Sequence, residues 1–129
     1  MIYIGVDLGL KRIGLAMSDG GVVVPLPAIE RKNRNQAANE LKAVLAEYGA
    51  DILVMGIPMG SDSEDEMRRR VAHFLSLVEF SGEIAYQDES FSSQEAEELM
   101  RGEIKYIRDG RIDSLSAKII LQRYLSRVD

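Results

Sequence analysis

The sequence predicts one α/β domain, covering residues 1–129, built around a five-stranded mixed sheet with helices on both faces. Three observations lead to this fold class. Residues 2–29 carry three short alternating apolar runs, which are typical of strands. The residues that follow alternate helical and strand patterns, as in sheets that continue through parallel strands. A chain of 129 residues buries enough apolar surface for one core, and it contains no cysteine that could form a disulfide.

The stretch from Ile2 to Ser18 predicts two strands joined by a glycine turn. Its first apolar run ends at Asp7, which places a carboxylate at the carboxyl edge of a central strand, where α/β folds bind their ligands. Spacing alone explains Asp7 equally well as a turn-capping residue. Gly14 interrupts the second strand, and a glycine there indicates either a β-bulge or a close approach of a ligand to the backbone.

A third strand is expected from Val22 to Ile29, after a hairpin turn at residues 19–21. Two prolines in this strand lack the backbone donor that a central strand needs, which predicts an edge position. Apolar residues then recur at helical spacing from Gln36 to Tyr48, and a glycine follows where helices commonly end.

The middle of the chain predicts a strand, a helix and a further strand. Residues 52–55 form an apolar run typical of a buried strand, and the helix before it makes this strand parallel to the first. An acidic loop, residues 60–66, leads into a helix that reaches Val78. Interaction with the helix dipole explains these acidic residues better than metal binding does. His73 lies beside the apolar stripe of this helix, and we expect a structural role for it. Residues 83–87 predict the last strand.

The carboxyl-terminal third predicts two helices. The first opens with Ser92 and Glu95, which have the spacing of a capping box, and runs to about Met100. After a charged connector, residues 103–111, the closing helix begins near Asp113, for which N-capping is the simplest role. The whole order of strands and helices is that of the ribonuclease H-like fold, a three-layer fold whose usual strand order is 3-2-1-4-5.

The net charge of −5 is unevenly distributed along the sequence. Residues 1–60 are neutral, residues 61–100 carry −8 and residues 101–129 carry +3. Local patches rather than net charge attract phosphate groups, so the carboxyl-terminal third can contact nucleic acid. Solvated helix faces explain the same charges at least as well. No apolar stretch is long enough to cross a membrane and no signal sequence is present, which predicts a soluble cytoplasmic protein.

Four motif-bearing segments span nearly the whole chain: Val6–Ala16, Val54–Pro58, Asp88–Ser90 with Ser92–Ala96, and Ile112–Gln122. In these segments and their order the chain resembles the YqgF family, also called RuvX, of Holliday junction resolvases. It departs from the family at Ser90, where arginine is common. It also departs at residues 59–62, where the family usually has an Asn-containing turn that ends in glycine. Neither departure touches a candidate metal ligand.

The resemblance implies a nuclease with two Mg²⁺ or Mn²⁺ ions, which need carboxylate ligands. The candidate catalytic and metal-binding residues are Asp7, Asp88, Glu89 and Asp113. If Asp7 ends the first strand and Asp88 the fifth, with one strand between them, their backbones are roughly 10 Å apart, a span that two ions can fill. Gly56, on the intervening strand, leaves this space open. The choice between Asp88 and Glu89 as second ligand stays open.

Contacts with phosphate groups are expected from five basic residues: Lys11, Arg12, Arg108, Arg111 and Lys118. Aromatic residues make up 6% of the chain, which favours recognition of backbone shape over base stacking. The family resemblance points to two substrates, the 5′ end of precursor 16S ribosomal RNA or the four-way DNA junction. We favour the RNA because resolution of a junction requires a stable two-fold dimer, whereas the helix stripes here are used to cover the sheet. The expected protein is a monomer or a weak homodimer.

Two other classes of protein are compatible with parts of the sequence. The motif from Asp7 to Gly14 also resembles the first phosphate motif of actin-like ATPases and sugar kinases, but those proteins need a second lobe that 129 residues cannot form. A nucleic-acid-binding protein with a catalytically silent metal site is the stronger alternative, because carboxylates alone do not establish turnover.

Overall fold

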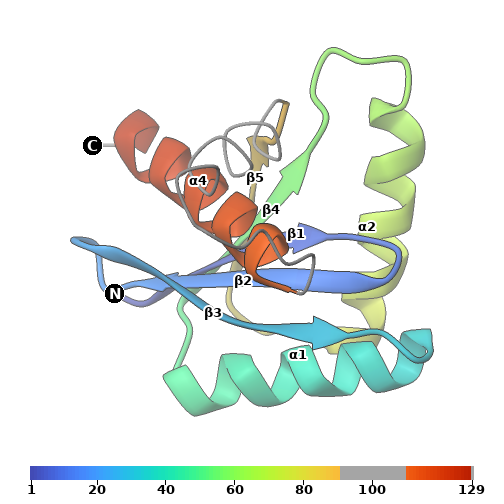
Figure 1. Cartoon of the computed structure of the whole chain (residues 1–129), viewed down its shortest axis with the longest axis horizontal. Coiled ribbons are helices and arrows are strands. Elements are labelled where there is room, and N and C mark those ends of the chain that lie inside the picture. The colour runs from blue at the N-terminus through green and yellow to red at the C-terminus, as the bar shows by residue number, and fades with distance from the viewer. Residues whose placement is uncertain (91–109, 129) are drawn as a thin grey trace, which may run out of the picture.

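The computed structural model describes residues 1–90 and 110–128, and it confirms the predicted fold class (Figure 1). Five strands form one mixed sheet in the order β3-β2-β1-β4-β5. The strands are β1 (Tyr3–Leu8), β2 (Arg12–Ser18), β3 (Val23–Glu30), β4 (Ile52–Ile57) and β5 (Glu83–Asp88). The helices within the described residues are α1 (Arg34–Tyr48), α2 (Glu64–Val78) and α4 (Arg111–Val128).

Strand β1 occupies the centre of the sheet. It pairs antiparallel with β2 and parallel with β4, and β4 pairs parallel with β5. Strand β3 lies at an edge, as predicted, since Pro25 and Pro27 have no N–H to offer a further strand. The carboxyl ends of β1, β4 and β5 therefore meet at one edge of the sheet.

Helices cover both faces of the sheet and produce three layers (Figure 1). Helices α1 and α2 pack on one face, together with the inward side chains of Ile4 and Val6 from β1. Helix α4 crosses the other face, where Leu121 packs directly against Gly5. Since side chains alternate along a strand, Asp7 lies on the same face as Gly5, under α4.

Two helices begin earlier than their apolar patterns predict. Helix α1 begins at Arg34 rather than Gln36, because Asn33 caps it. The Oδ1 atom of Asn33 accepts a hydrogen bond of 2.7 Å from the backbone N–H of Gln36, whose side chain accepts one from the N–H of Asn33 in return. Helix α2 begins at Glu64, so the acidic residues 64–66 form its first turn, as the helix-dipole interpretation predicted.

The carboxyl-terminal predictions have mixed outcomes. The helix predicted from Ser92 to Met100 lies outside the described residues, as does most of the connector 103–111. Helix α4 is confirmed, but Asp113 is its third residue and not its N-cap, because the helix begins at Arg111. Within the part of the chain that the structure describes, none of the helices combines the length and apolar character needed to cross a membrane.

Candidate active site

Two carboxyl groups meet over the carboxyl ends of the central strands. Asp7 lies near the end of β1, and Glu89 follows the last residue of β5. Their side chains are joined by a hydrogen bond. Burial, then the nearby charge of Glu89, its hydrogen bond and the charge of Asp113 raise the pKa of Asp7 from 3.8 to about 8. Asp7 is therefore protonated near neutral pH when no cation is bound, and it can donate to the Glu89 carboxylate.

The pKa of Glu89 is also raised. Burial of the carboxylate is the main cause, and the charge of Asp88 adds to it, whereas the hydrogen bond from Asp7 acts in the opposite direction. Two adjacent carboxyl groups that both resist ionisation share one proton between them. A positive charge placed between Asp7 and Glu89 would let both groups ionise.

Gly56 of β4 lies directly beside Glu89 and Ile120. A Cβ atom on Gly56 would lie 2.6 Å from Cδ1 of Ile120, 3.2 Å from Cβ of Glu89 and 3.3 Å from its Oε2. Any side chain at this position would therefore require the side chain of Ile120 or of Glu89 to move. That Gly56 leaves space for ions between Asp7 and the end of β5 stays a prediction, since the atoms nearest to it belong to Ile120 and Glu89.

Asp113 reaches the site from the other layer, on the first turn of α4. Its charge contributes to the raised pKa of Asp7. Gly14, the residue paired with Asp7 across β1 and β2, lies directly under the backbone carbonyl group of Asp113. The β2–β3 register shifts between Ile13 and Leu15, where Gly14 faces two residues of β3, so a bulge is present but its extra residue lies on β3. The close approach predicted at Gly14 is made by a helix of the protein itself.

Ser114 fastens the start of α4 to the sheet at this bulge. Its hydroxyl group donates to the backbone oxygen of Leu26 on β3 at 2.6 Å and accepts from the N–H of Leu15 on β2 at 3.3 Å. Leu15 and Leu26 are paired residues of the two strands. The hydroxyl group of Ser114 therefore connects their backbone N–H and C=O groups next to the bulge, where the regular hydrogen bonds between the strands are interrupted. This anchor fixes the position of Asp113 next to it.

Asp88, the other candidate for the second ligand, makes different contacts. Its Oδ1 atom accepts hydrogen bonds from the backbone N–H of Met59 at 3.2 Å, and from the N–H and hydroxyl groups of Ser90 at 3.0 and 2.7 Å. Burial raises the pKa of Asp88, but these hydrogen bonds outweigh burial and leave the pKa below its ordinary value. Asp88 is thus an ionised residue that holds the chain together at the end of β5.

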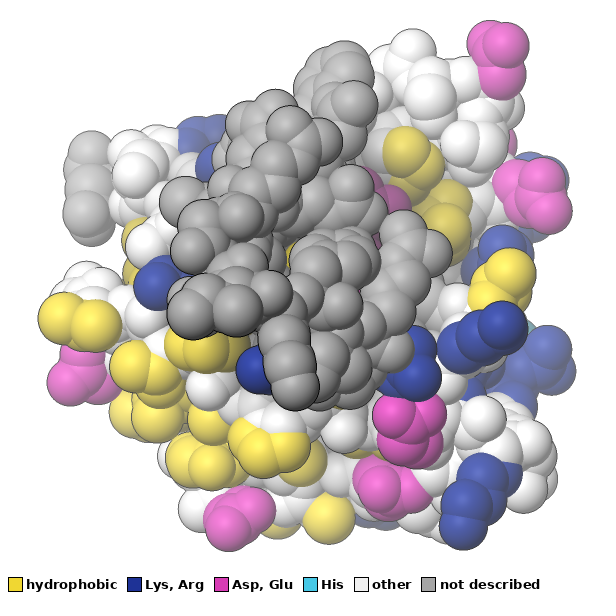
Figure 2. Space-filling model, viewed as in Figure 1, with side chains coloured by type: hydrophobic (Ala, Val, Ile, Leu, Met, Phe, Trp, Pro, Cys, Tyr) yellow, Lys and Arg dark blue, Asp and Glu magenta, His cyan; other side chains and the backbone are white. Residues whose placement is uncertain are grey.

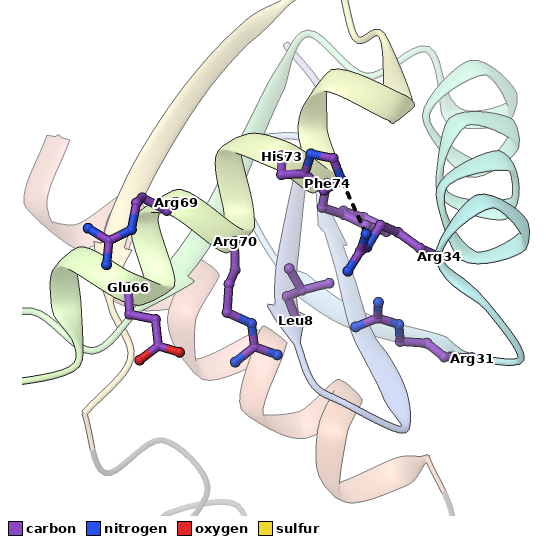
Figure 3. A pocket seen from close by; sticks show the side chains of 8 residues that line it. All are labelled: Leu8, Arg31, Arg34, Glu66, Arg69, Arg70, His73 and Phe74. Atoms are coloured by element: carbon purple, nitrogen blue, oxygen red, sulfur yellow. Dashed lines mark hydrogen bonds between the residues drawn. The ribbon is translucent and has the colours of Figure 1, made fainter.

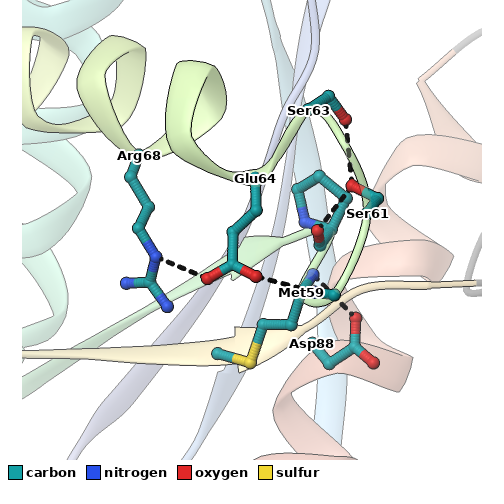
Figure 4. Close-up of polar contacts among 8 residues, drawn as sticks. Met59, Ser61, Ser63, Glu64, Arg68 and Asp88 are labelled. Atoms are coloured by element: carbon teal, nitrogen blue, oxygen red, sulfur yellow. Dashed lines mark hydrogen bonds and ion pairs between the residues drawn. The ribbon is translucent and has the colours of Figure 1, made fainter.

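Figure 4 shows how Asp88 joins the loop between β4 and α2. Within this loop, the hydroxyl group of Ser61 donates to the backbone oxygen of Pro58 at 2.8 Å. The carboxylate of Glu64 accepts from the N–H of Gly60 at 2.6 Å and pairs with Arg68 at 2.9 Å. The loop that departs from the family pattern at residues 59–62 is therefore closed by its own hydrogen bonds.

The predicted phosphate-binding residues are only partly brought together. Lys11 lies exposed in the turn after β1, and Arg12, the first residue of β2, forms an ion pair of 2.7 Å with Glu30. Arg111 and Lys118 lie on α4, Arg111 exposed and Lys118 half-buried. Arg108 lies outside the described residues.

Sequence reasoning missed a second basic group, which lines a pocket on the opposite face: Arg31, Arg34, Arg69 and Arg70. Two of these residues belong to a basic loop and two to a run of three arginines at residues 68–70. That run was the available signal, but it falls in a segment whose net charge is −8. Summing charge along the sequence concealed a cluster that forms only in space.

The sheet order and the carboxylates at its carboxyl edge define a protein of the ribonuclease H-like class. A family model, RuvX, described as Holliday junction resolvase, matches residues 1–127. The chain belongs to the RuvX family, and so to a family of nucleases. A relative from Sulfurimonas denitrificans, named "Putative pre-16S rRNA nuclease", is 69% identical over 126 residues, which cover 97% of each chain.

Solved structures of junction resolvases share the fold. The Fowlpox virus resolvase in complex with Holliday junction DNA has a TM-score of 0.60 at 11% identity, with 99% of both chains covered. RuvC of T. thermophilus, in complex with a Holliday junction substrate, has a TM-score of 0.58 at 14% identity, covering 99% of this chain and 96% of the other. At such identities the likeness establishes the common fold alone.

Proposed function

We propose that this protein is a metal-dependent nuclease that hydrolyses phosphodiester bonds of structured RNA, and that it processes the 5′ end of precursor 16S ribosomal RNA. The observation that carries the proposal is the half-buried, hydrogen-bonded pair Asp7 and Glu89, with Asp113 beside it at the carboxyl edge of the sheet. Three half-buried acidic residues from separate elements repel one another when ionised, and a divalent cation offsets this repulsion.

The residues fit a divalent cation by their chemistry. Carboxylate oxygens are the ligands that Mg²⁺ and Mn²⁺ prefer, and the described residues include neither a cysteine nor a histidine beside the pair. Within residues 1–90 and 110–128, no group of three acidic or histidine side chains is already arranged as a metal site. Asp7 and Glu89 are joined by a hydrogen bond, whereas Asp113 acts on Asp7 through its charge.

Asp7 and Glu89 would hold the metal, and Asp113 would complete the site. A bound divalent ion supplies an activated water and stabilises the charge that develops on the phosphate oxygens. Asp7 and Glu89 must release their shared proton as the cation enters, so occupancy of the site rises with pH. We assign Asp88 a supporting part, because its Oδ1 accepts three hydrogen bonds from Ser90 and from the loop at Met59.

The proposed RNA substrate rests on two observations. The Sulfurimonas relative bears the name of a pre-16S rRNA nuclease, and its 69% identity is high enough to make a shared substrate the simplest inference. In addition, the apolar faces of α1, α2 and α4 are buried against the sheet, so these helices offer no extensive apolar face to a second copy. A nuclease that cuts one RNA strand needs one site.

Resolution of four-way DNA junctions is the second candidate function, because the RuvX family model carries that description. The two substrates can be compared directly. The purified protein is incubated with a labelled precursor 16S RNA fragment and with a labelled four-way junction, each with Mn²⁺ or with EDTA, while light scattering gives its mass. We expect Mn²⁺-dependent cleavage of the RNA by a monomer. Symmetric paired cuts in the junction by a stable dimer, with the RNA untouched, would instead establish the second function.

A further inference from the structure

A pocket of about 290 Å³ lies on the face opposite α4. It is lined by Leu8 and Phe74, by Glu66 and His73, and by the four arginines Arg31, Arg34, Arg69 and Arg70. Leu8 follows Asp7 directly along β1, so the pocket and the carboxylates lie at the same edge of the sheet on opposite faces. Figure 3 shows that Arg31, Arg34 and Arg70 extend into the pocket from the β3–α1 connection, from α1 and from α2.

Among the described residues, basic side chains outnumber acidic ones in the lining of this pocket. None of its four guanidinium groups forms an ion pair with a carboxylate of the described residues, although Glu66 lies at the rim. Arg31 instead donates to the backbone oxygen of Gly9 at 2.6 Å and stacks over Phe74, 5.5 Å from the ring centre. Burial, followed by the charges of Arg34 and Arg70, lowers the pKa of Arg31. Like charges are thus held together at a cost in folding free energy.

Arg34 is placed where a positive charge destabilises a helix. It is the first residue of α1, next to the N-cap Asn33, and the first turn of this helix contains no acidic residue. Its guanidinium group lies 3.2 Å from Nε2 of His73, which must be the acceptor because a guanidinium group can only donate. This contact holds Arg34 at the pocket mouth. Stability of the helix does not explain an arginine here, whereas binding of an anion does.

We propose that the pocket formed by Arg31, Arg34 and Arg70 binds a backbone phosphate group of the substrate strand, away from the phosphate that is cleaved. The inference rests on the proposed nuclease function and adds a second contact to it. Guanidinium groups suit phosphate oxygens because they donate several parallel hydrogen bonds. Figure 2 shows Lys and Arg side chains gathered on the side of α2, continuous with this edge of the molecule.

The test compares two variants with equal loss of charge. Arg34→Gln/Arg70→Gln removes two exposed arginines of the pocket, and Lys42→Gln/Arg127→Gln removes two exposed basic residues elsewhere. Binding of a short fluorescein-labelled single-stranded RNA is measured by anisotropy in EDTA, across a series of salt concentrations. We expect the pocket variant to bind about tenfold more weakly, with a salt slope reduced by about 0.7, since the pocket holds one phosphate and each phosphate contact on a single strand contributes about 0.7.

Three further measurements make the result decisive. The melting temperature of the pocket variant should equal or exceed that of the wild type, because like charges have been removed. Its kcat/KM for the RNA with Mn²⁺ should fall by the same factor as RNA binding, while the control variant keeps the wild-type value. Inorganic phosphate is added as a competitor to both variants with RNA bound. It should displace the RNA from both at the same concentrations, because it competes for the phosphate-binding sites that remain in each. Equal weakening by both variants, or selective binding of inorganic phosphate with RNA binding unaffected, would overturn the proposal. Loss of RNA binding in a protein that cleaves nothing supports the pocket and contradicts the nuclease function.

Discussion

The backbone carbonyl oxygen of Asp113 lies so close to Gly14 that a Cβ atom at position 14 would be 1.9 Å from it. Gly14 is paired with Asp7 across the central strands. The missing side chain on β2 therefore determines how near α4 can bring Asp113 to Asp7. The glycine acts on the site through packing rather than through backbone conformation.

Substitution Gly14→Ala should displace the first turn of α4. Forcing a methyl group against backbone atoms costs about 1–3 kcal/mol, and the Ser114 anchor would be strained as well. We expect a loss of this size in urea unfolding, together with reduced cleavage. Gly21→Ala is the matched control, because its Cβ would meet only Oδ1 of Asp19 at 3.4 Å. Equal stability of the two variants would contradict the packing role of Gly14.

The variants Asp7→Asn and Asp113→Asn should each abolish metal-dependent cleavage while leaving the fold intact. Outer partners of a metal site typically contribute about 10–100-fold to affinity or activity, and a direct ligand should exceed this. Calorimetric titration with Mn²⁺ and a cleavage assay measure the two losses, and circular dichroism checks the fold. Full activity in either purified variant would contradict the metal-site proposal.

Glu89→Gln and Asp88→Ala should separate a ligand from a supporting residue. We expect Glu89→Gln to lose Mn²⁺ binding with little loss of stability. Asp88→Ala should retain Mn²⁺ binding but lower the free energy of unfolding by about 1–3 kcal/mol, because the N–H groups of Met59 and Ser90 lose a charged acceptor. The opposite pattern in titration and unfolding would assign the metal to Asp88.

Stability of the metal-free protein should depend on pH through Asp7. Its pKa in the folded protein, about 8, lies above the ordinary value of 3.8, so the folded protein keeps this proton when the unfolded chain has released it. The resulting stabilisation is complete below about pH 4 and is lost as the pH rises through about 8. Urea unfolding in EDTA should show this decline, and Asp7→Asn should flatten it. Identical pH profiles would show that Asp7 ionises normally.

The alternating side chains of a strand explain why one of two adjacent carboxylates joins Asp7. Asp88 points towards the α2 side, where it meets Met59, whereas Glu89 points towards α4 and Asp7. The sequence contained this information, because the strand register predicts opposite faces for neighbouring residues. The sequence did not define the last residue of β5, which was expected at Gln87 and lies at Asp88.

Other features of the site could not be predicted from sequence. The pattern of apolar residues located the strands and helices, because burial imposes its own period on each. The pocket of arginines joins Arg31 and Arg34 to Arg70 across 36 residues of sequence, and no local pattern reports such a meeting. The N-cap role expected for Asp113 was also wrong, since helix limits depend on caps and connectors more than on periodicity.

The positions of Asp7 and Leu8 limit the shape of any nucleic acid that uses both faces of this sheet edge. These neighbouring residues face opposite layers, one towards the carboxylates and one into the arginine pocket. A strand that touched both would have to curve around the turn after β1. A continuous duplex resists such curvature, because its persistence length is about 150 base pairs. Flexible ends, single-stranded segments and branch points bend readily. The protein would therefore select its targets by the flexibility of the nucleic acid rather than by base sequence.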